Sequence, residues 1–398
     1  MRNISLVLFL LFFASVVGSL ASTINVPAQQ PTIQAGINAA VNGDTVLVAP
    51  GTYVENINFL GKAIKVKSSG GRKVTIIDGN AAAPVAVFVT NEGARSVLSG
   101  FTLQNGVGTF EFGYEGGGVY ISFSSPTIKG NVIKNSTAGY GGGVGVYFGS
   151  PVITENTITG NSASFGGGVA IGGASNAQLT HNMINNNTAD DGAGVELDAA
   201  ANGLIEDNKI LSNIAGGQGG GLWIVNEADE IIVQNLIAKN NAPSGSQIYS
   251  LIPQSTTGLR FINNTIVSAA NGGADAAFIA DGFNTNVVIE NNIISAVGDQ
   301  AALLCNPIYV DGPPIVEFND AFNPSVAYGD SCTGLGGTNG NISANPEFVS
   351  KSNYQLGASS PAINAGTNSA PDLPAKDLVG HPRIVDGTID MGAYEYPH

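Results

Sequence analysis

The chain has 398 residues, of which 43% are hydrophobic and 11% charged, and its net charge is −15. This hydrophobic content is high enough for a packed core, which excludes a disordered glycine-rich chain. The acidic charge repels phosphate backbones and anionic lipid, so we expect no nucleic-acid partner.

Residues 1–21 have the pattern of a secretory signal peptide. Arg2 supplies the positive start, an apolar stretch runs from Leu6 to Val17, and Ser19-Leu20-Ala21 is a small-x-small cleavage site. The stretch is short for a transmembrane helix, and no second apolar segment of spanning length follows. We therefore expect a secreted or cell-surface protein with no membrane span after signal removal. An uncleaved N-terminal anchor is the alternative.

A short helix is predicted over residues 31–41, at the start of the mature chain. The segment begins with Pro31 and places its apolar residues at helical spacing. Such a helix would cover the first coil of a stacked structure, whose apolar end would otherwise face water. Alternating strands are predicted to follow at residues 45–48 and 63–66, with a Pro-Gly turn between them.

A glycine-rich tag then recurs every 25 to 27 residues, and an asparagine recurs in the same phase. An apolar residue stands three residues before and two residues after each asparagine. A fixed period of this size indicates a stacked-coil solenoid. The tags begin at Gly116, Gly141, Gly166, Gly192 and Gly219, and the asparagines are Asn131, Asn156, Asn182, Asn208, Asn235, Asn264 and Asn292.

A parallel β-helix fits this repeat better than two other solenoids. Leucine-rich repeats need a leucine-dominated consensus, and Ca²⁺-binding β-rolls have a nine-residue period. In a β-helix the apolar columns point inward, glycines turn the corners, and asparagine amides hydrogen-bond along the axis, where Asn also tolerates left-handed turns. We predict an all-β, right-handed parallel β-helix over residues 22–299, including the N-terminal cap. Residues 300–398 are expected to hold the last coils and an irregular C-terminal cap.

The two cysteines, Cys305 and Cys332, are expected to form a disulfide. An even number of cysteines in an exported chain favours pairing. Their separation is about one repeat, which would place them on neighbouring coils. No histidine lies near either one in sequence, so we do not expect a metal site or a catalytic thiol there.

The strand after each glycine tag carries the candidate functional residues. Strand alternation directs its second and fourth residues outward, away from the core. Tyr120, Tyr147 and Trp223 are candidate substrate-binding residues, because aromatic rings pack on the apolar faces of sugars. The first outward column is Tyr120, Gly145, Ala170, Glu196 and Trp223, and the second is Ser122, Tyr147, Gly172, Asp198 and Val225.

Glu196 and Asp198 are candidate catalytic carboxylates. Two residues apart on one strand, their Cα atoms lie about 6.5–7 Å apart, within reach of the roughly 5–9.5 Å carboxylate separations used in glycoside hydrolysis. Asp190 and Asp191 precede the same tag and are candidate Ca²⁺ ligands, because Ca²⁺ prefers several oxygens. Ca²⁺ is the one cofactor that the sequence suggests. A solvated acidic face without catalysis is the alternative interpretation.

Both ends of the chain resemble secreted bacterial right-handed parallel β-helix proteins of the pectin-lyase-like superfamily. The resemblance rests on Pro31-Thr32-Ile33-Gln34, Gly43-Asp44-Thr45-Val46 and Pro50-Gly51-Thr52-Tyr53 near the start, and on Asn345-Pro346, Ser360 to Gly366 and Asp390 to Glu395 near the end. It implies the same fold over nearly the whole mature chain. The Asn-Thr-Asp and Gly-His-Gly motifs of the superfamily's hydrolases are absent, and the outward columns lack the Arg or Lys base of its lyases.

We therefore expect a secreted or cell-surface β-helix, acting as a monomer, that binds extracellular polysaccharide. Lyase or hydrolase activity is left open at this point. A structural or adhesive surface module without catalytic activity is the alternative.

Overall fold

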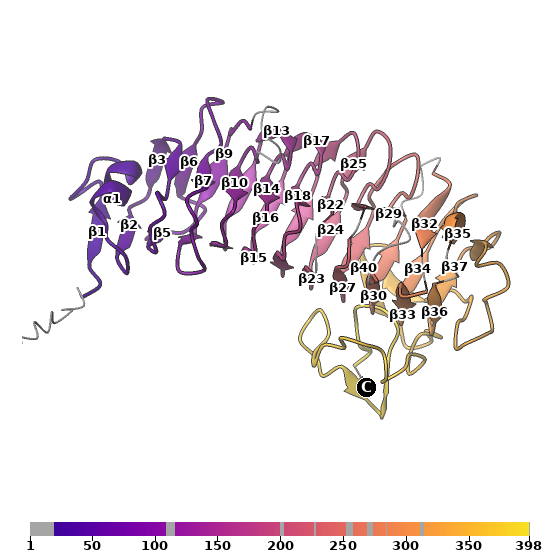
Figure 1. The fold of residues 1–398 in the computed structure, drawn as a ribbon. Helices are drawn as coiled ribbons and strands as arrows, with labels where there is room; N and C mark the ends of the chain where they lie inside the picture. Colours follow the sequence, from indigo (N-terminus) through magenta and orange to yellow (C-terminus); the bar gives the residue numbers. More distant parts are fainter. Residues whose placement is uncertain are drawn as a thin grey trace, which may run out of the picture.

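A computed structural model describes residues 20–108, 116–199, 203–226, 228–251, 258–268, 274–283, 285–310 and 314–397. The signal-peptide prediction lies outside the described residues, except for its last two positions. The described chain winds into a long parallel β-solenoid with three main walls, which we call sheets I, II and III (Figure 1). This confirms the predicted fold class. Each coil passes through sheets I, II and III in turn.

The three main sheets each collect one strand per coil. Sheet I is ordered β1 (Thr23–Val26), β2 (Thr45–Val48), β5 (Lys65–Ser68), β8 (Val97–Ser99), β11 (Thr127–Lys129), β15 (Val152–Thr154), β19 (Gln178–Thr180), β23 (Leu204–Glu206), β27 (Ile231–Val233), β30 (Arg260–Ile262), β33 (Val288–Glu290) and β36 (Ile315–Glu317). Sheet II is ordered β3 (Gly51–Val54), β6 (Thr75–Asp78), β9 (Thr102–Gln104), β12 (Val132–Lys134), β16 (Thr157–Thr159), β20 (Met183–Asn185), β24 (Lys209–Leu211), β28 (Leu236–Ala238), β31 (Thr265–Val267), β34 (Ile293–Ser295) and β37 (Asp320–Phe322).

Sheet III carries the strands that follow the glycine tags. It contains β4 (Ile57–Asn58), β7 (Ala86–Phe88), β10 (Val119–Ser122), β14 (Val144–Tyr147), β18 (Val169–Gly172), β22 (Val195–Asp198), β26 (Leu222–Val225), β29 (Ile248–Leu251), β32 (Ala276–Phe283), β35 (Ala301–Val310) and β38 (Tyr328–Asp330). A short fourth sheet, sheet IV, lies between sheets II and III along the chain. It contains β13 (Thr137–Tyr140), β17 (Ser162–Phe165), β21 (Thr188–Ala189) and β25 (Ile214–Ala215).

The predicted isoleucine columns form the core. In sheet II, Ile133 pairs with Ile158, which pairs with Ile184, and all three are fully buried. β-Branched side chains suit this arrangement, because each one packs on its counterpart in the next parallel strand. The same alternation that buries these residues turns their neighbours outward.

The N-terminal end is closed by α1 (Ile33–Ala39), as predicted (Figure 1). The Oγ1 atom of Thr32 accepts a hydrogen bond from the backbone N–H of Ala35 at 3.0 Å. This cap satisfies one of the donors that the first helical turn leaves without an intrahelical partner.

The asparagine column forms an amide ladder at the turn between sheets I and II. Asn182 accepts hydrogen bonds from the backbone N–H and Nδ2 of Asn156, at 2.9 and 3.1 Å. Its own Nδ2 donates to the carbonyl of Ile153 at 2.8 Å and to Oδ1 of Asn208 at 3.1 Å. The left-handed conformation that we expected of the asparagines belongs to the preceding residue instead, as at His181 with φ of 56°.

A second amide ladder, which the sequence analysis did not identify, lines the turn between sheets II and IV. Its members bond in the same way, with Nδ2 of Asn187 donating to Oδ1 of Asn213 at 3.0 Å. The ladder is formed by Asn161, Asn187, Asn213 and Asn240.

The glycine tags turn the chain from sheet IV into sheet III. Gly141 has a φ of +66°, a left-handed conformation that glycine adopts without strain. A Cβ on Gly142 would lie 2.5 Å from the carbonyl oxygen of Ser162 in the next coil. Glycine is therefore required at both positions, for the turn at the first and for the close approach of coils at the second.

The C-terminal segment, from residue 345 onward, folds back against the last coils (yellow in Figure 1). It contains the antiparallel hairpins β39 (Phe348–Ser350) with β40 (Asn353–Leu356), and β41 (Ile384–Val385) with β42 (Thr388–Ile389). Gln234 Nε2 donates to the carbonyl of Lys376 at 2.7 Å, and Asn263 Nδ2 donates to that of Asp390 at 3.1 Å. These bonds fasten the segment to the turn between sheets I and II.

The predicted disulfide is confirmed, with Cys305 in β35 bonded to Cys332 just after β38 and a Cα–Cα distance of 5.4 Å. The two strands are neighbours in sheet III, so the bond links adjacent coils as expected. Within the part of the chain that the structure describes, no helix is long and apolar enough to cross a membrane.

Candidate functional site

The register of sheet III confirms the two outward columns. Glu196 in β22 is paired with Ala170 in β18 on one side and with Trp223 in β26 on the other. Asp198, two residues further along β22, is paired with Gly172. The outer face of sheet III therefore gathers the predicted acids and the tryptophan on two successive coils.

Three aromatic rings form a row along this face, which we call the aromatic row. Tyr140 and Phe165 end β13 and β17 of sheet IV, and their ring centroids are 5.1 Å apart with planes 23° from parallel. Phe165 stacks on Trp223 at 5.5 Å and 18°. Because Phe165 and Trp223 come from coils two apart, their contact passes over the intervening coil, which carries Glu196. The Trp223 Nε1–H donates to Oε1 of Gln218 at 3.0 Å and holds the indole in place.

Glu196 is covered rather than solvated, in contrast to the open strand face expected from sequence. Only 1% of it is exposed, and its Oε2 atom has no hydrogen-bond partner. A Cβ on Gly192 would lie 3.0 Å from Cβ of Trp223 and 3.3 Å from Cβ of Glu196, so both side chains pack against the glycine turn at Gly192. Burial, followed by the charges of Asp198 and Asp191, raises the pKa of Glu196 well above its usual value. Glu196 is therefore a buried carboxyl group that keeps its proton to a higher pH than an exposed glutamate does.

Asp198 lies nearer the surface and is half-buried. The Nδ2 group of Asn226, from the next coil, donates a hydrogen bond to its Oδ1. Glu196 and Asp198 thus have different surroundings on one strand, one enclosed by aromatic side chains and the other supported by an amide. Different environments of this kind separate the roles of two carboxyl groups in acid–base chemistry.

Asp190 and Asp191 enter the coil of Glu196 just before its glycine tag. Asp190 is exposed, whereas Oδ1 of Asp191 accepts a hydrogen bond from the backbone N–H of Gln218 at 2.6 Å. Burial and the nearby charge of Asp190 raise the pKa of Asp191. Among the described residues, no three His, Cys, Asp or Glu side chains form a set that could hold a metal ion. The assignment of Asp190 and Asp191 as Ca²⁺ ligands stays a prediction.

The structure separates the two predicted tyrosines from this acid pair. Tyr147 lies two coils before Asp198, where its ring meets Phe148 at 4.4 Å and Phe123 at 6.3 Å, both edge to face. Tyr120 lies one coil earlier still and is half-buried. Trp223 is thus the predicted aromatic residue that adjoins the acids.

Sequence reasoning missed the residues that stand immediately before the glycine tags. Tyr140, Phe165, Asp191 and Gln218 occupy this one position in successive coils and form the side of the face next to sheet IV. The column of residues before the tags was available as a signal in the repeat. Reading it would have predicted aromatic residues beside the outward columns.

A further tyrosine extends the face toward the C-terminus. Tyr249 in β29 is paired with Trp223, and its hydroxyl donates to Oδ2 of Asp281 at 2.5 Å. The Oδ1 atom of Asp281 is buried without a hydrogen-bond partner. Burial and the bonded Asp281 carboxylate raise the pKa of Tyr249 above its ordinary value. The face thus contains two buried carboxyl oxygens without donors, one in Glu196 and one in Asp281.

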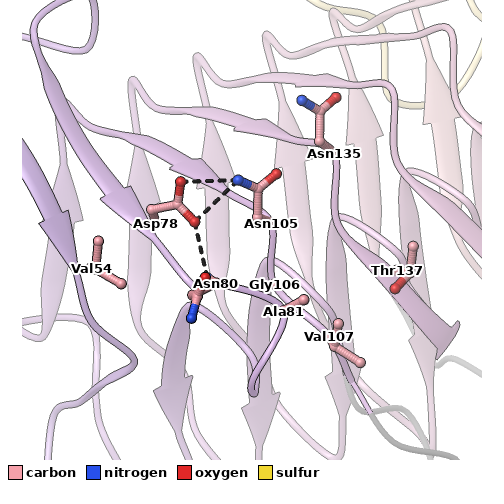
Figure 2. Close-up of a pocket in the computed structure, with 9 residues that line it drawn as sticks. All are labelled: Val54, Asp78, Asn80, Ala81, Asn105, Gly106, Val107, Asn135 and Thr137. Atoms are coloured by element: carbon pink, nitrogen blue, oxygen red, sulfur yellow. Dashed lines mark hydrogen bonds between the residues drawn. The ribbon is translucent and has the colours of Figure 1, made fainter.

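A separate polar hollow of about 420 Å³ opens in the N-terminal coils, beside the C-terminal ends of strands β3, β6 and β9 of sheet II (Figure 2). Asp78 lines this hollow, and its carboxylate accepts hydrogen bonds from Asn105 Nδ2 at 2.9 Å, Gln104 Nε2 at 2.7 Å and the backbone N–H of Asn80 at 2.9 Å. Although burial acts to raise the pKa of Asp78, these bonds outweigh it and hold the pKa below its usual value. With its oxygens already bonded, Asp78 serves to position Asn105.

Comparisons with known proteins agree with this architecture. A family model described as "Right handed beta helix region" matches residues 117–294. A search of curated proteins gives no match. Among solved structures, the crystal structure of pectate lyase Pel9A is similar, with a TM-score of 0.60 and 16% sequence identity over 95% of this chain and 97% of that chain. The chain therefore has a right-handed parallel β-helix fold, similar in its arrangement to that pectate lyase.

Proposed function

We propose that the outer face of sheet III binds extracellular polysaccharide. The observation that carries this proposal is the aromatic row of Tyr140, Phe165 and Trp223, which lies beside buried acid groups. An elongated solenoid face with half-buried rings and a few polar groups suits a polymer whose repeating units have apolar faces and hydroxyl groups. The solved structure with a similar fold, Pel9A, is named a pectate lyase, and pectate is a polysaccharide.

Export of the protein belongs to the same proposal. Residues 1–21 have the signal-peptide pattern, and the Cys305–Cys332 disulfide suits an oxidising compartment. A secreted or cell-surface monomer would meet polysaccharide outside the cell. Detection of the disulfide-bonded chain, cleaved after Ala21, in the medium or at the cell surface tests this part.

Catalysis by Glu196 and Asp198 is the finer part of the proposal. A carboxyl group with a raised pKa beside a second carboxyl group is the arrangement needed for general-acid cleavage of a glycosidic bond. Glu196 lies under the Phe165–Trp223 contact, so a sugar reaches it only when the indole moves. Release of reducing ends that disappears in Glu196→Gln supports catalysis. Equal release by Glu196→Gln would assign the activity elsewhere.

Binding is tested with a glycan array and titration calorimetry on the wild type and on Trp223→Ala. The substitution removes one end of the aromatic row, and we expect affinity to fall about tenfold, or about 1.4 kcal/mol. Phe348→Ala, in the C-terminal hairpin, is the matched loss of a half-buried ring away from sheet III. Glycan binding that Trp223→Ala leaves unchanged would refute this site, and a lack of any glycan ligand would favour a structural or adhesive module.

A further inference from the structure

The basic residues of the central coils all lie away from sheet III. Between residues 135 and 259, the sequence has only three of them: His181, Lys209 and Lys239. His181 lies in the turn between sheets I and II, Lys209 begins β24 of sheet II, and Lys239 directly follows β28 of sheet II. No strand of sheet III, from β4 to β38, contains a Lys, Arg or His.

Acidic residues, in contrast, gather on or beside this face. Asp191 precedes β22, Glu196 and Asp198 lie within it, and Asp281 lies in β32. Asp198 and Asp191 both act to raise the pKa of Glu196, and Glu196 and Asp198 do the same to Tyr140. The local potential is therefore negative, in a chain whose net charge is already −15.

We propose that the polysaccharide bound by the sheet III face is uncharged, an inference that rests on the proposed function. A uronate placed on the face would lose water from its carboxylate and find no Lys, Arg or His to replace it. It would also be repelled by Asp198 and Asp191 over distances shorter than the screening length of about 8 Å in physiological salt. A neutral sugar pays neither of these penalties.

The unpartnered oxygens favour the same class of ligand. Oε2 of Glu196 and Oδ1 of Asp281 are buried carboxyl oxygens without a hydrogen-bond partner, and their residues are 1% and 6% exposed. Sugar hydroxyl groups can both donate and accept, so they can pair with these oxygens whether or not Glu196 holds a proton, whereas an ionised carboxylate of the ligand can only accept. The polar contacts that the face can offer therefore suit hydroxyl groups.

Two exposed phenylalanines extend the apolar contact at the opposite end of the strands. Phe123 and Phe148 directly follow β10 and β14, are 62% and 42% exposed, and stack at 5.1 Å with planes 16° apart. Both have left-handed backbones, with φ of 48° and 49°, and the next three coils repeat this conformation at Gly173, Ala199 and Asn226. The left-handed turn therefore recurs from coil to coil, and in these two coils it carries exposed aromatic rings.

The surroundings keep these rings in place. A Cβ on Gly173 would lie 2.7 Å from the ring of Tyr147, so glycine in this coil leaves room for the tyrosine. Tyr147 in turn contacts both phenylalanines and belongs to the second outward column of sheet III. We assign Phe123, Tyr147 and Phe148, here called the phenylalanine platform, to contact with the apolar faces of the same neutral chain.

Binding of soluble glycans by affinity electrophoresis and calorimetry tests this assignment. The panel contains uncharged β-glucan, galactan and mannan, together with polygalacturonate, each at low and high salt and with either EDTA or Ca²⁺. We expect at least one neutral glycan to bind with an affinity that changes less than about twofold with salt, because no charge pair forms. Polygalacturonate is expected not to bind under any of these conditions.

Three variants sharpen the experiment. Phe123→Gly combined with Phe148→Asn should weaken binding of the neutral glycan about tenfold, while Val54→Ala, which removes exposed apolar surface from sheet II, should not. Asp198→Lys supplies the missing cation and should allow measurable binding of polygalacturonate. Circular dichroism checks that each variant is folded.

The outcomes separate the inference from the function on which it rests. Polygalacturonate that binds the wild type more tightly than every neutral glycan, with or without Ca²⁺, overturns the inference and keeps the polysaccharide function. No binding by any glycan overturns both. Normal glycan binding by the double phenylalanine variant would refute the assignment of the phenylalanine platform to glycan contact. If the wild type is a dimer and this variant is a monomer, the platform is an interface between copies of the chain.

Discussion

Glu230 gives the most direct test of the interior electrostatics. It directly precedes β27 and points into the solenoid, where its Cγ would lie 3.1 Å from a Cβ on Gly203 of the previous coil. Glu230 is 1% exposed, and neither carboxyl oxygen has a hydrogen-bond partner. Burial is the main cause that raises its pKa from 4.5 to about 8. We therefore expect Glu230→Gln to make the protein more stable at neutral pH.

The magnitude follows from proton linkage. Between pH 4.5 and about pH 8, the folded state keeps the proton of Glu230 while the unfolded state has lost it, so stability falls as the pH rises. At about 1.4 kcal/mol per pH unit, this costs the wild type about 3 kcal/mol at pH 7 and under about 1 kcal/mol at pH 5. Glutamine has the same shape and no charge, so Glu230→Gln removes the loss.

Urea unfolding followed by circular dichroism, at several pH values from 5 to about 8, measures the difference between variant and wild type. We expect the advantage of Glu230→Gln to grow by about 2–3 kcal/mol from pH 5 to pH 7. Glu155→Gln is the control, since Glu155 is an exposed residue that pairs with Lys129 at 3.1 Å. A difference between Glu230→Gln and wild type that stays constant with pH would refute the reasoning, because it would mean that Glu230 ionises freely within the fold.

Three further predictions concern the stability of the coils. Asn182→Ala removes an amide that bonds to neighbouring strands and turns, and should lower the free energy of urea unfolding by about 3–5 kcal/mol. Asn185→Ala is the control and should lower it by under about 1 kcal/mol, because the Oδ1 atom of Asn185 has no partner. Equal losses would contradict the role of the ladder. Reduction of Cys305–Cys332 should lower stability by about 3–4 kcal/mol, seen as a shift of the urea midpoint that is absent in Cys305→Ala. Phe148→Asn should leave stability unchanged or raise it by up to about 1 kcal/mol, because asparagine tolerates the left-handed backbone; a larger loss in thermal unfolding would show that the ring mainly stabilises the fold.

Much of the fold could be predicted because the repeat acts through neighbouring coils alone. The spacing of Asn156 and Asn182 places both amides in one ladder, and the isoleucines beside them follow in register. The outward positions of Glu196 and Trp223 came from the same alternation. Each of these features depends on contacts between neighbouring coils, and the period of the repeat equals the sequence separation of the residues in contact.

The surroundings of the candidate site followed from contacts that the period does not contain. Phe165 and Trp223 meet across an intermediate coil, and their stacking encloses Glu196, which the sequence placed on an open face. The fastening of Gln234 to Lys376 likewise joins a coil to the distant C-terminal segment. Long side chains reach beyond their own coil in directions set by their packed neighbours. The amino-acid sequence alone therefore determined the stacking of the coils and which residues face outward, whereas the tertiary structure decided which outward residues are buried and which are exposed.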